Sequence, residues 1–238
     1  MRVVLSRKGF DMGSGGAPSP IADGRPVSLP IPTRRRSVTN YDDLGFGDIV
    51  EHVTRGRIAR DHLCHEDPMF ANGECLFGQC GAAQAHLCNQ GVSLGDFILF
   101  FGLFAEEETG ERHHRFFAYV RIDEIIAPPN GRLGALDRPH PHTLGEWNDN
   151  NTIYRGAGEV AKRDRPSLRL TQPGGPLRHW IVPAWLEAAG LSYHRKPERW
   201  LAAERLEIVA RGQEFVTDIG DDPAAHEWLN RTVEAIRS

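Results

Sequence analysis

The chain has 238 residues, of which 40% are hydrophobic and 25% charged, and its formal net charge is −4. This composition is typical of a globular protein with a sizeable core and excludes a disordered or fibrous chain. The longest strongly apolar run, residues 97–104, is too short to cross a bilayer. Residues 1–10 lack the apolar core and cleavage site of a signal peptide. The sequence therefore predicts a cytoplasmic protein with no membrane partner.

The charge is distributed unevenly along the chain. Residues 1–60 contain ten Lys or Arg and six Asp or Glu, a net charge of +4, whereas the remainder has a net charge of −8. A basic face on an acidic body is compatible with nucleic acid held in one groove. An ordinary solvated surface explains the same counts.

The predicted regular elements are short and of both types. In chain order they are a strand over 2–6, an extended edge segment over 27–32, a helix over 42–54, a helix over 81–89, strands over 95–104, 115–126, 167–171, 205–210 and 214–218, and a helix over 223–237. The strands over 95–104 and 115–126 predict an antiparallel hairpin that resembles the strand pair of PUA-like barrels. Glycine- and proline-rich loops over 7–20 and 127–150 separate the elements. The sequence predicts a single α+β domain, residues 1–238, with a mixed or antiparallel sheet and long ordered loops.

The four cysteines fall within 25 residues, at Cys64, Cys75, Cys80 and Cys88. They are separated by ten, four and seven residues, so the chain has no C-x2-C pair of the kind that presents thiolates to structural zinc. Buried free thiols explain such residues more simply in a reducing cytosol. The sequence therefore favours free cysteines over a zinc site.

Two polar segments in the first third of the chain are candidates for chemistry. In residues 6–16 a strand delivers Lys8 and Asp11 to a glycine-rich turn, whose amides can approach a phosphate or a sugar closely. The segment is not a triphosphate-binding G-x-x-x-x-G-K-[ST] loop, and a turn with a Lys8–Asp11 ion pair is an equal alternative. Residues 65–68 place an acidic pair before proline, for which turn chemistry is the favoured interpretation.

Two further segments lie later in the chain. Residues 138–154 contain asparagines that can read a base edge, and Trp147 or Tyr154 can stack on an unpaired base. Asparagine is also common in turns, and the His-x-His at 140–142 is weak support for a metal. Residues 210–215 interrupt an apolar strand with polar groups that are costly to bury unpaired, so they form an internal network or face a pocket. These segments alone select no reaction.

Four sequence blocks resemble a known protein family, and this resemblance selects a reaction. The blocks that carry it are SRKGFDMGSGGAPSP at 6–20, FGQCGAAQAHLCNQGV at 77–92 with GDFILFFG at 95–102, LTQPGG at 170–175 and ARGQEFVTD at 210–218. In these blocks the chain resembles the nucleotide modification associated domain family, third type. The family is associated with phage and bacterial systems that modify DNA bases or counter modified bases, and similar members include a phage-defence DNA glycosylase.

The resemblance implies a monofunctional DNA glycosylase that flips a glucosylated hydroxymethylcytosine out of phage DNA and hydrolyses its N-glycosidic bond. The product is an abasic site that blocks phage replication. The implied partner is DNA carrying modified bases, and no cofactor or metal ion is implied. The main alternative is a PUA-like reader that binds a modified base and recruits another effector without chemistry of its own. An enzyme that builds a modified base, or a structural partner in a larger complex, are weaker alternatives.

A glycosylase needs a carboxylate that stabilises the oxocarbenium-like sugar or orients the attacking water. Asp11 is the first candidate because it lies in the glycine-rich loop at a strand end, and Asp67, Glu214 and Asp149 follow in that order. Lys8 is an alternative as a Schiff-base nucleophile that would also cut the strand. The candidate contacts to base, sugar or phosphate are Arg7, Lys8, Ser14, Gln79, Gln90, Asn151, Tyr154, Arg155, Arg211 and Gln213.

Overall fold

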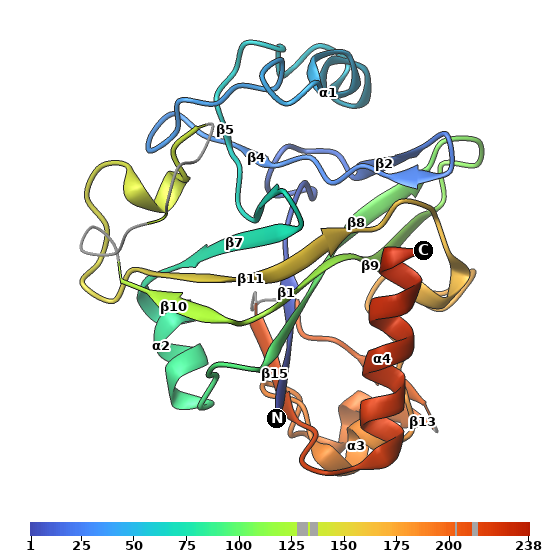
Figure 1. Ribbon diagram of the computed structural model, residues 1–238. Helices are drawn as coiled ribbons and strands as arrows, with labels where there is room; N and C mark the ends of the chain where they lie inside the picture. Colours follow the sequence, from blue (N-terminus) through green and yellow to red (C-terminus); the bar gives the residue numbers. More distant parts are fainter. Residues whose placement is uncertain (128–132, 134–137, 203, 211–213) are drawn as a thin grey trace.

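A mixed β-sheet organises the chain (Figure 1). The computed structural model describes residues 1–127, 133, 138–202, 204–210 and 214–238. Within these residues ten strands form the main sheet, whose central path runs β15–β1–β8–β9–β11–β7–β6. Its strands are β1 (Arg2–Arg7), β2 (Ser19–Ala22), β3 (Arg25–Pro26), β6 (Met69–Ala71), β7 (Glu74–Gln79), β8 (Phe97–Glu106), β9 (Arg112–Arg121), β10 (Glu124–Ile126), β11 (Thr152–Val160) and β15 (Glu214–Asp218).

Helices and two small sheets surround the main sheet. The helices are α1 (Gly47–Thr54), α2 (Gly81–Asn89), α3 (Trp185–Ala189) and α4 (Pro223–Arg237), with 3-10 turns η1 (Pro141–Thr143), η2 (Pro166–Leu168) and η3 (Pro197–Arg199). One small sheet contains β12 (His179–Ile181), β14 (Arg205–Glu207) and β13 (Trp200–Ala202), and the other pairs β4 (Ile31–Pro32) with β5 (Cys64–His65). The predicted α+β class with a mixed sheet is confirmed. None of the described helices combines the length and the apolar character needed to span a membrane.

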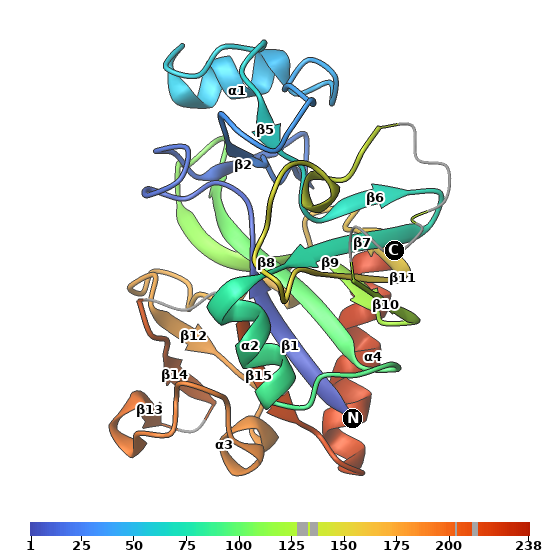
Figure 2. The same ribbon diagram turned by 90° about the vertical axis from the view of Figure 1, so that its left-hand side faces the viewer.

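Strand β1 lies between two hydrophobic cores. It pairs with β8 in parallel and with β15 antiparallel. Val3 and Leu5 face a core that includes Leu229 of α4, whereas Val4 faces a core that includes Leu87 of α2. Helices α2 and α4 accordingly lie on different sides of β1 (Figure 2). Burial on both faces explains why the sequence of β1 is continuously apolar instead of alternating.

The predicted hairpin is confirmed as β8 and β9. The two strands pair from Phe97 with Arg121 to Ala105 with Arg112. The single strand predicted over 115–126 is divided in the structure, because β10 leaves β8 and pairs with β11. The strand predicted over 167–171 is wrong, since η2 and isolated bridges occupy this segment.

Strand β11 lies outside every strand predicted from the sequence, and its glycines explain why. A Cβ added to Gly156 would lie 1.7 Å from the Arg121 carbonyl oxygen, and one added to Gly158 would lie 2.6 Å from that of Tyr119. The backbones approach this closely because β11 pairs with β7 at its start and with β9 at its end. Glycine inside a strand marks such a close approach, but the same residues read as a loop when the neighbours are unknown.

The chain between β1 and β6 forms a cap over one end of the sheet, and α1 lies at its outer side (Figure 1). The cap has its own small core, which includes Phe10, Tyr41 and Val50. Helix α1 begins at Gly47, later than predicted, because residues 41–46 form turns and the Tyr41 hydroxyl donates a 2.8 Å hydrogen bond to the Pro30 carbonyl. The cap also carries β5 and the acidic residues that follow it toward the end of β1.

Candidate functional site

Polar residues gather where four strands begin or end beneath the cap. Lys8 directly follows β1, and β15 begins at Glu214, which is paired with Ser6 of β1. Strand β7 ends at Gln79, opposite Thr152 at the start of β11. An antiparallel strand starts where its neighbour ends. The end of β1 therefore lies beside the start of β15, and the end of β7 lies beside the start of β11. The two pairs meet because Gln79 Nε2 donates a 2.7 Å hydrogen bond to Glu214 Oε1.

Lys8 bridges two buried carboxylates at this place. Its Nζ atom is 3.8 Å from Asp67 Oδ2 and 3.6 Å from Glu214 Oε1. The ammonium also lies 4.3 Å from the centroid of the Phe77 ring, a cation–π contact. The side chains of Asp67 and Glu214 are only 3% and 1% exposed. Burial of charge at such depth requires pairing, and Lys8 provides it for both carboxylates.

Glu214 combines a fixed oxygen with an unpaired one. Its Oε1 accepts hydrogen bonds from Ser6 Oγ at 3.0 Å and from Gln79 Nε2. Its buried Oε2 has no hydrogen-bond partner among the described residues. Burial raises the pKa of Glu214 above its ordinary value, against the lowering effect of Lys8 and of the two hydrogen bonds. A carboxyl group of this kind is suited to give a proton to a bound molecule.

Asp67 has the opposite electrostatics. Burial opposes its ionisation, but the His140 imidazole and the charge of Lys8 together hold the pKa of Asp67 below its ordinary value. Its Oδ1 also accepts a 2.7 Å hydrogen bond from the Gly78 amide. The site therefore contains one ionised carboxylate beside another that retains a proton more readily. Such separation of two pKa values is typical of acid–base sites.

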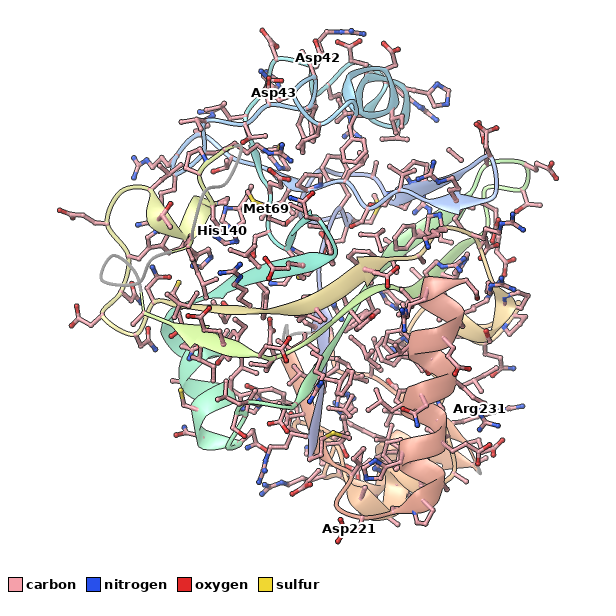
Figure 3. The ribbon with its side chains drawn as sticks, viewed as in Figure 1. Asp42, Asp43, Met69, His140, Asp221 and Arg231 are labelled. Atoms are coloured by element: carbon pink, nitrogen blue, oxygen red, sulfur yellow. The ribbon has the colours of Figure 1, made fainter. Side chains whose placement is uncertain are left out.

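Three histidines surround Asp67. The Nε2 atoms of His65 and His142 lie 3.9 and 4.0 Å from Oδ2, and that of His140 lies 3.4 Å from Oδ1. Burial lowers the pKa of His65, and it lowers that of His142 to about 4, so both imidazoles are neutral at neutral pH. His140, which Figure 3 labels, lies on the opposite side of the molecule from Arg231 on α4.

A cavity of about 200 Å³ opens onto these groups. It is lined by Arg7, Lys8, Gly9, Asp11, Ser14, Ile31, His65, Asp67, Gly78, Gln79, Cys80, His142 and Trp147. The Trp147 ring stacks on His142 at a centroid distance of 4.0 Å, and the Arg36 guanidinium lies 4.1 Å from the Trp147 centroid. Pockets for drug-sized ligands measure roughly 300–1,000 Å³. The smaller volume here suits one ring system, so a base that carries a sugar would place one of its two rings in the cavity and extend out through the opening.

The sequence model of the family described as nucleotide modification associated domain 3 matches residues 2–218. The chain belongs to this family. The resemblance seen in the sequence blocks is thereby confirmed, and it links the chain to the processing of modified nucleotides. Neither the curated proteins nor the solved structures contain a match. The matched range runs from β1 to the end of β15, so the domain includes Lys8, Asp67 and Glu214.

The domain brings half of the predicted site residues together. Those that line the cavity are Arg7, Lys8, Asp11, Ser14, Asp67 and Gln79. Glu214 joins them through Lys8 and Gln79. Asp11 is separate from this network: its Oδ1 accepts the amides of Gly13 and Ser14 at 2.7 and 2.6 Å and so fixes the glycine-rich turn. The structure therefore groups Asp67 and Glu214, the second- and third-ranked carboxylates, around one lysine.

Asn151 supports the cavity without lining it. Its Oδ1 lies 2.6 Å from His142 Nδ1, and its Nδ2 donates a 2.8 Å hydrogen bond to the His142 carbonyl. Since the amide nitrogen is the donor to the carbonyl, Oδ1 is the acceptor and His142 Nδ1 carries the proton. Asn151 is thus a positioning residue for His142.

Other predicted contacts lie away from the cavity. Tyr154 is in the core, where its hydroxyl donates a 3.0 Å hydrogen bond to Gln84 Oε1. Arg155 forms a 2.7 Å ion pair with Glu74. Gln90 caps the end of α2, and Asp149 is exposed. Arg211 and Gln213 lie outside the described residues.

Two groups of residues near the cavity were not predicted to act there. The first is the histidine set around Asp67, whose sequence signals are the His-x-Asp at 65–67 and the His-x-His at 140–142. The second is the exposed run Arg34–Arg36, which follows β4 and reaches the cavity rim through Arg36 and Trp147. The run of three arginines is visible in the sequence, but its position beside Trp147 requires the fold.

The cysteines do not converge on a metal site within the described part of the chain. All four are free, with Cys64 and Cys75 buried and Cys88 exposed. Burial raises the pKa of Cys64 to about 12 and that of Cys75 well above its ordinary value, so neither readily forms a thiolate. Among the described residues the only His, Cys, Asp and Glu group close enough to share an ion is His65, Asp67 and His142.

Proposed function

We propose that this chain is a DNA glycosylase that excises a hypermodified cytosine, glucosylated hydroxymethylcytosine, from phage DNA in antiviral defence. The observation that supports an enzyme is the position of Lys8 between Asp67 and Glu214, two buried carboxylates with opposite pKa shifts, beside a base-sized cavity. The modified base and the phage origin of the DNA come from the sequence resemblance.

The residues of the site suit a hydrolytic mechanism. The target base is flipped into the cavity. Glu214 gives its proton to the departing base while the C1′–N bond breaks, and positive charge develops on the sugar. The Asp67 carboxylate stabilises that charge and takes a proton from water, whose oxygen forms the new bond to C1′. The products are the free base and an abasic sugar. Asp67 then releases its proton to solvent, and solvent returns a proton to Glu214.

The two carboxylates differ in state although both face Lys8. Its charge favours ionisation of both, and Asp67 receives additional support from His140, whereas burial dominates at Glu214. The Lys8 Nζ atom is engaged by Asp67, by Glu214 and by the Phe77 ring. These contacts favour the water-using, monofunctional mechanism over a Schiff base on Lys8.

Substrate selection follows from the polar lining of the cavity. Arg7 and Ser14 face the cavity together with the glycine-rich turn, and their donors would pair with the polar substituent of a modified base. An ordinary cytosine leaves such groups unpaired, which is a stronger filter than shape alone. The exposed Arg34–Arg36 run at the rim supplies phosphate contacts.

The test is incubation of the pure protein with glucosylated phage DNA and with matched unmodified DNA. Mass spectrometry measures the free modified base, and an aldehyde-reactive probe measures abasic sites. We expect multiple turnovers on modified DNA only, loss of release with Glu214→Gln, and normal release with Glu227→Gln, whose side chain is 66% exposed on α4. Stoichiometric binding without release would overturn the enzyme and support the reader. Equal release from both DNAs would overturn the proposed selectivity.

A further inference from the structure

We propose that His65, Asp67 and His142 bind one divalent transition-metal ion at the wall of the cavity. One donor atom from each of the three residues lies within 4.8 Å of the other two. In a tetrahedral site with metal–ligand distances of about 2.1 Å, neighbouring donor atoms are about 3.4 Å apart. The observed separations of 3.9 and 4.0 Å between the imidazole Nε2 atoms and Asp67 Oδ2 exceed this value by about half an ångström. The donor atoms of the two histidines lie within 4.8 Å of each other, so binding of the ion requires both rings to move inward.

The donors are oriented by groups behind them. His142 Nδ1 donates to Asn151 Oδ1, which leaves the Nε2 lone pair directed to the cluster. The Gly78 amide occupies Asp67 Oδ1 and leaves Oδ2 for the ion. Hydrogen bonds of this kind fix the tautomer and direction of ligands in metal sites.

His140 provides a second, independent observation. It is fully buried, and its Nε2 is a buried polar atom without a hydrogen bond of good geometry among the described residues. Its Nδ1 accepts the His142 amide at 3.2 Å, so Nε2 carries the proton and points to Asp67 Oδ1 at 3.4 Å. A buried N–H directed at Oδ1 holds the Asp67 carboxylate in orientation, as groups behind the ligands of metal sites do.

The chemistry of the donors defines the class of ion. Two neutral imidazoles and one carboxylate suit Zn²⁺ or Fe²⁺, and three protein ligands leave positions for water or substrate. Lys8 lies 3.8 Å from the same Asp67 oxygen and competes with the ion, but Glu214 at 3.6 Å offers it another partner. With Asp67 as its ligand, the ion would take the place of that carboxylate in activating water, because it would lower the pKa of a bound water molecule. Only this last role rests on the proposed glycosylase, and the ion departs from the metal-free site that the sequence resemblance implies.

The test measures metal binding alone, without DNA. Protein stripped with a chelator is titrated with Co²⁺, followed by visible absorption, and with Zn²⁺, followed by calorimetry. We expect one ion per chain. His65→Ala and His142→Ala should each weaken binding at least 100-fold, and Asn151→Ala about 10–100-fold. His62→Ala, at an exposed histidine near β5, and Cys88→Ser should have no effect.

The histidine variants can lose metal binding simply because they misfold, so a second measurement uses the wild-type protein alone. Binding to the folded chain alone raises the melting temperature, so Zn²⁺ should raise that of the stripped wild-type protein. No saturable binding by the wild type, or binding that survives His142→Ala, would overturn the metal site. Base release by a protein that binds no ion would contradict the metal site and leave the proposed glycosylase intact. Ion binding without base release would contradict the glycosylase and leave the metal site intact.

Discussion

The imidazole of His142 lies directly over the backbone of Gly78. A Cβ at Gly78 would be 2.2 Å from His142 Cδ2, although the backbone conformation of Gly78 is open to other residues. The same glycine donates its amide to Asp67 Oδ1. The absence of a side chain at one position of β7 therefore allows a histidine and a carboxylate from distant segments to meet.

Gly78→Ala should displace His142 and disable the site while the sheet remains folded. The added methyl group cannot be accommodated without moving the ring, and the ring is the movable partner. We expect base release and Co²⁺ binding each to fall at least tenfold, with circular dichroism unchanged. Gly13→Ala is the matched control, because its nearest atom would be at 3.4 Å. If Gly78→Ala retains both properties, His142 has no role in the cavity.

Two of the candidate carboxylates, Glu214 and Asp11, should differ in their effect on base release. Glu214→Gln removes the proton donor and should lower the rate constant of base release by about 10²–10⁴-fold. Asp11→Asn keeps the side-chain oxygen that accepts the amides of the glycine-rich turn, so it removes only a charge and should cost less than tenfold. Single-turnover base release measures both. A larger loss with Asp11→Asn than with Glu214→Gln would restore the ranking that the sequence favours.

The arginine run should contribute to binding of DNA irrespective of its bases. Replacing Arg34, Arg35 and Arg36 by Gln should weaken binding to modified and unmodified DNA alike. It should also reduce the slope of the logarithm of the binding constant against the logarithm of the salt concentration. The expected reduction is about 0.9 for each phosphate that the protein no longer neutralises. Fluorescence anisotropy at several salt concentrations measures both. Arg231→Gln is the control, since Arg231 is exposed on α4, on the other side of the molecule from His140 (Figure 3). Equal effects of both changes would contradict a rim contact.

Acid should destabilise the fold through buried histidines. Burial lowers the pKa of His113 and of His114 from 6.5 to about 4. Between these values the unfolded chain binds protons that the folded chain does not. The free energy of unfolding therefore falls as pH decreases from about 6.5 to 4, by up to about 3 kcal/mol for each histidine.

His113→Phe should remove part of this loss. Both ring nitrogens of His113 lack hydrogen-bond partners among the described residues, so the change should leave stability at pH 7.5 equal or greater. Urea unfolding at pH 7.5 and 4.5 measures the difference. His62→Phe, at an exposed position, should keep the full loss. A pH dependence in His113→Phe equal to that of the wild type would show that His113 titrates normally.

The elements that sequence patterns predict well are those whose signals are local. The apolar run of β1, the β8–β9 hairpin, and α2 and α4 were all predictable from periodicity and from flanking turn residues. Helix α4 illustrates this, since Asp222 caps it and Pro223 occupies its first turn. Strand β11 was not predictable, because the reason for its glycines lies in the neighbouring strand.

The candidate site is also built from contacts between distant segments, which sequence patterns do not predict. Lys8, Asp67 and Glu214 were each predictable as polar residues in candidate segments, but nothing local indicates that they meet. Their contacts connect segments 59 to 206 positions apart and depend on the cap and on the pairing of β1 with β15. The pKa values that distinguish Asp67 from Glu214 arise only from that assembly.

The pairing of Ser6 with Glu214 has a consequence for synthesis of the protein. Ser6 of β1 and Glu214 of β15 are 208 positions apart in the chain. During synthesis one edge of β1 therefore stays unpaired until residue 214 has been added, and folding of so distant a pair is slow. A chain that stops before residue 214 lacks both this partner strand and the proposed proton donor. We therefore expect such truncated chains to release no base, because the cavity is completed only when β15 has been translated.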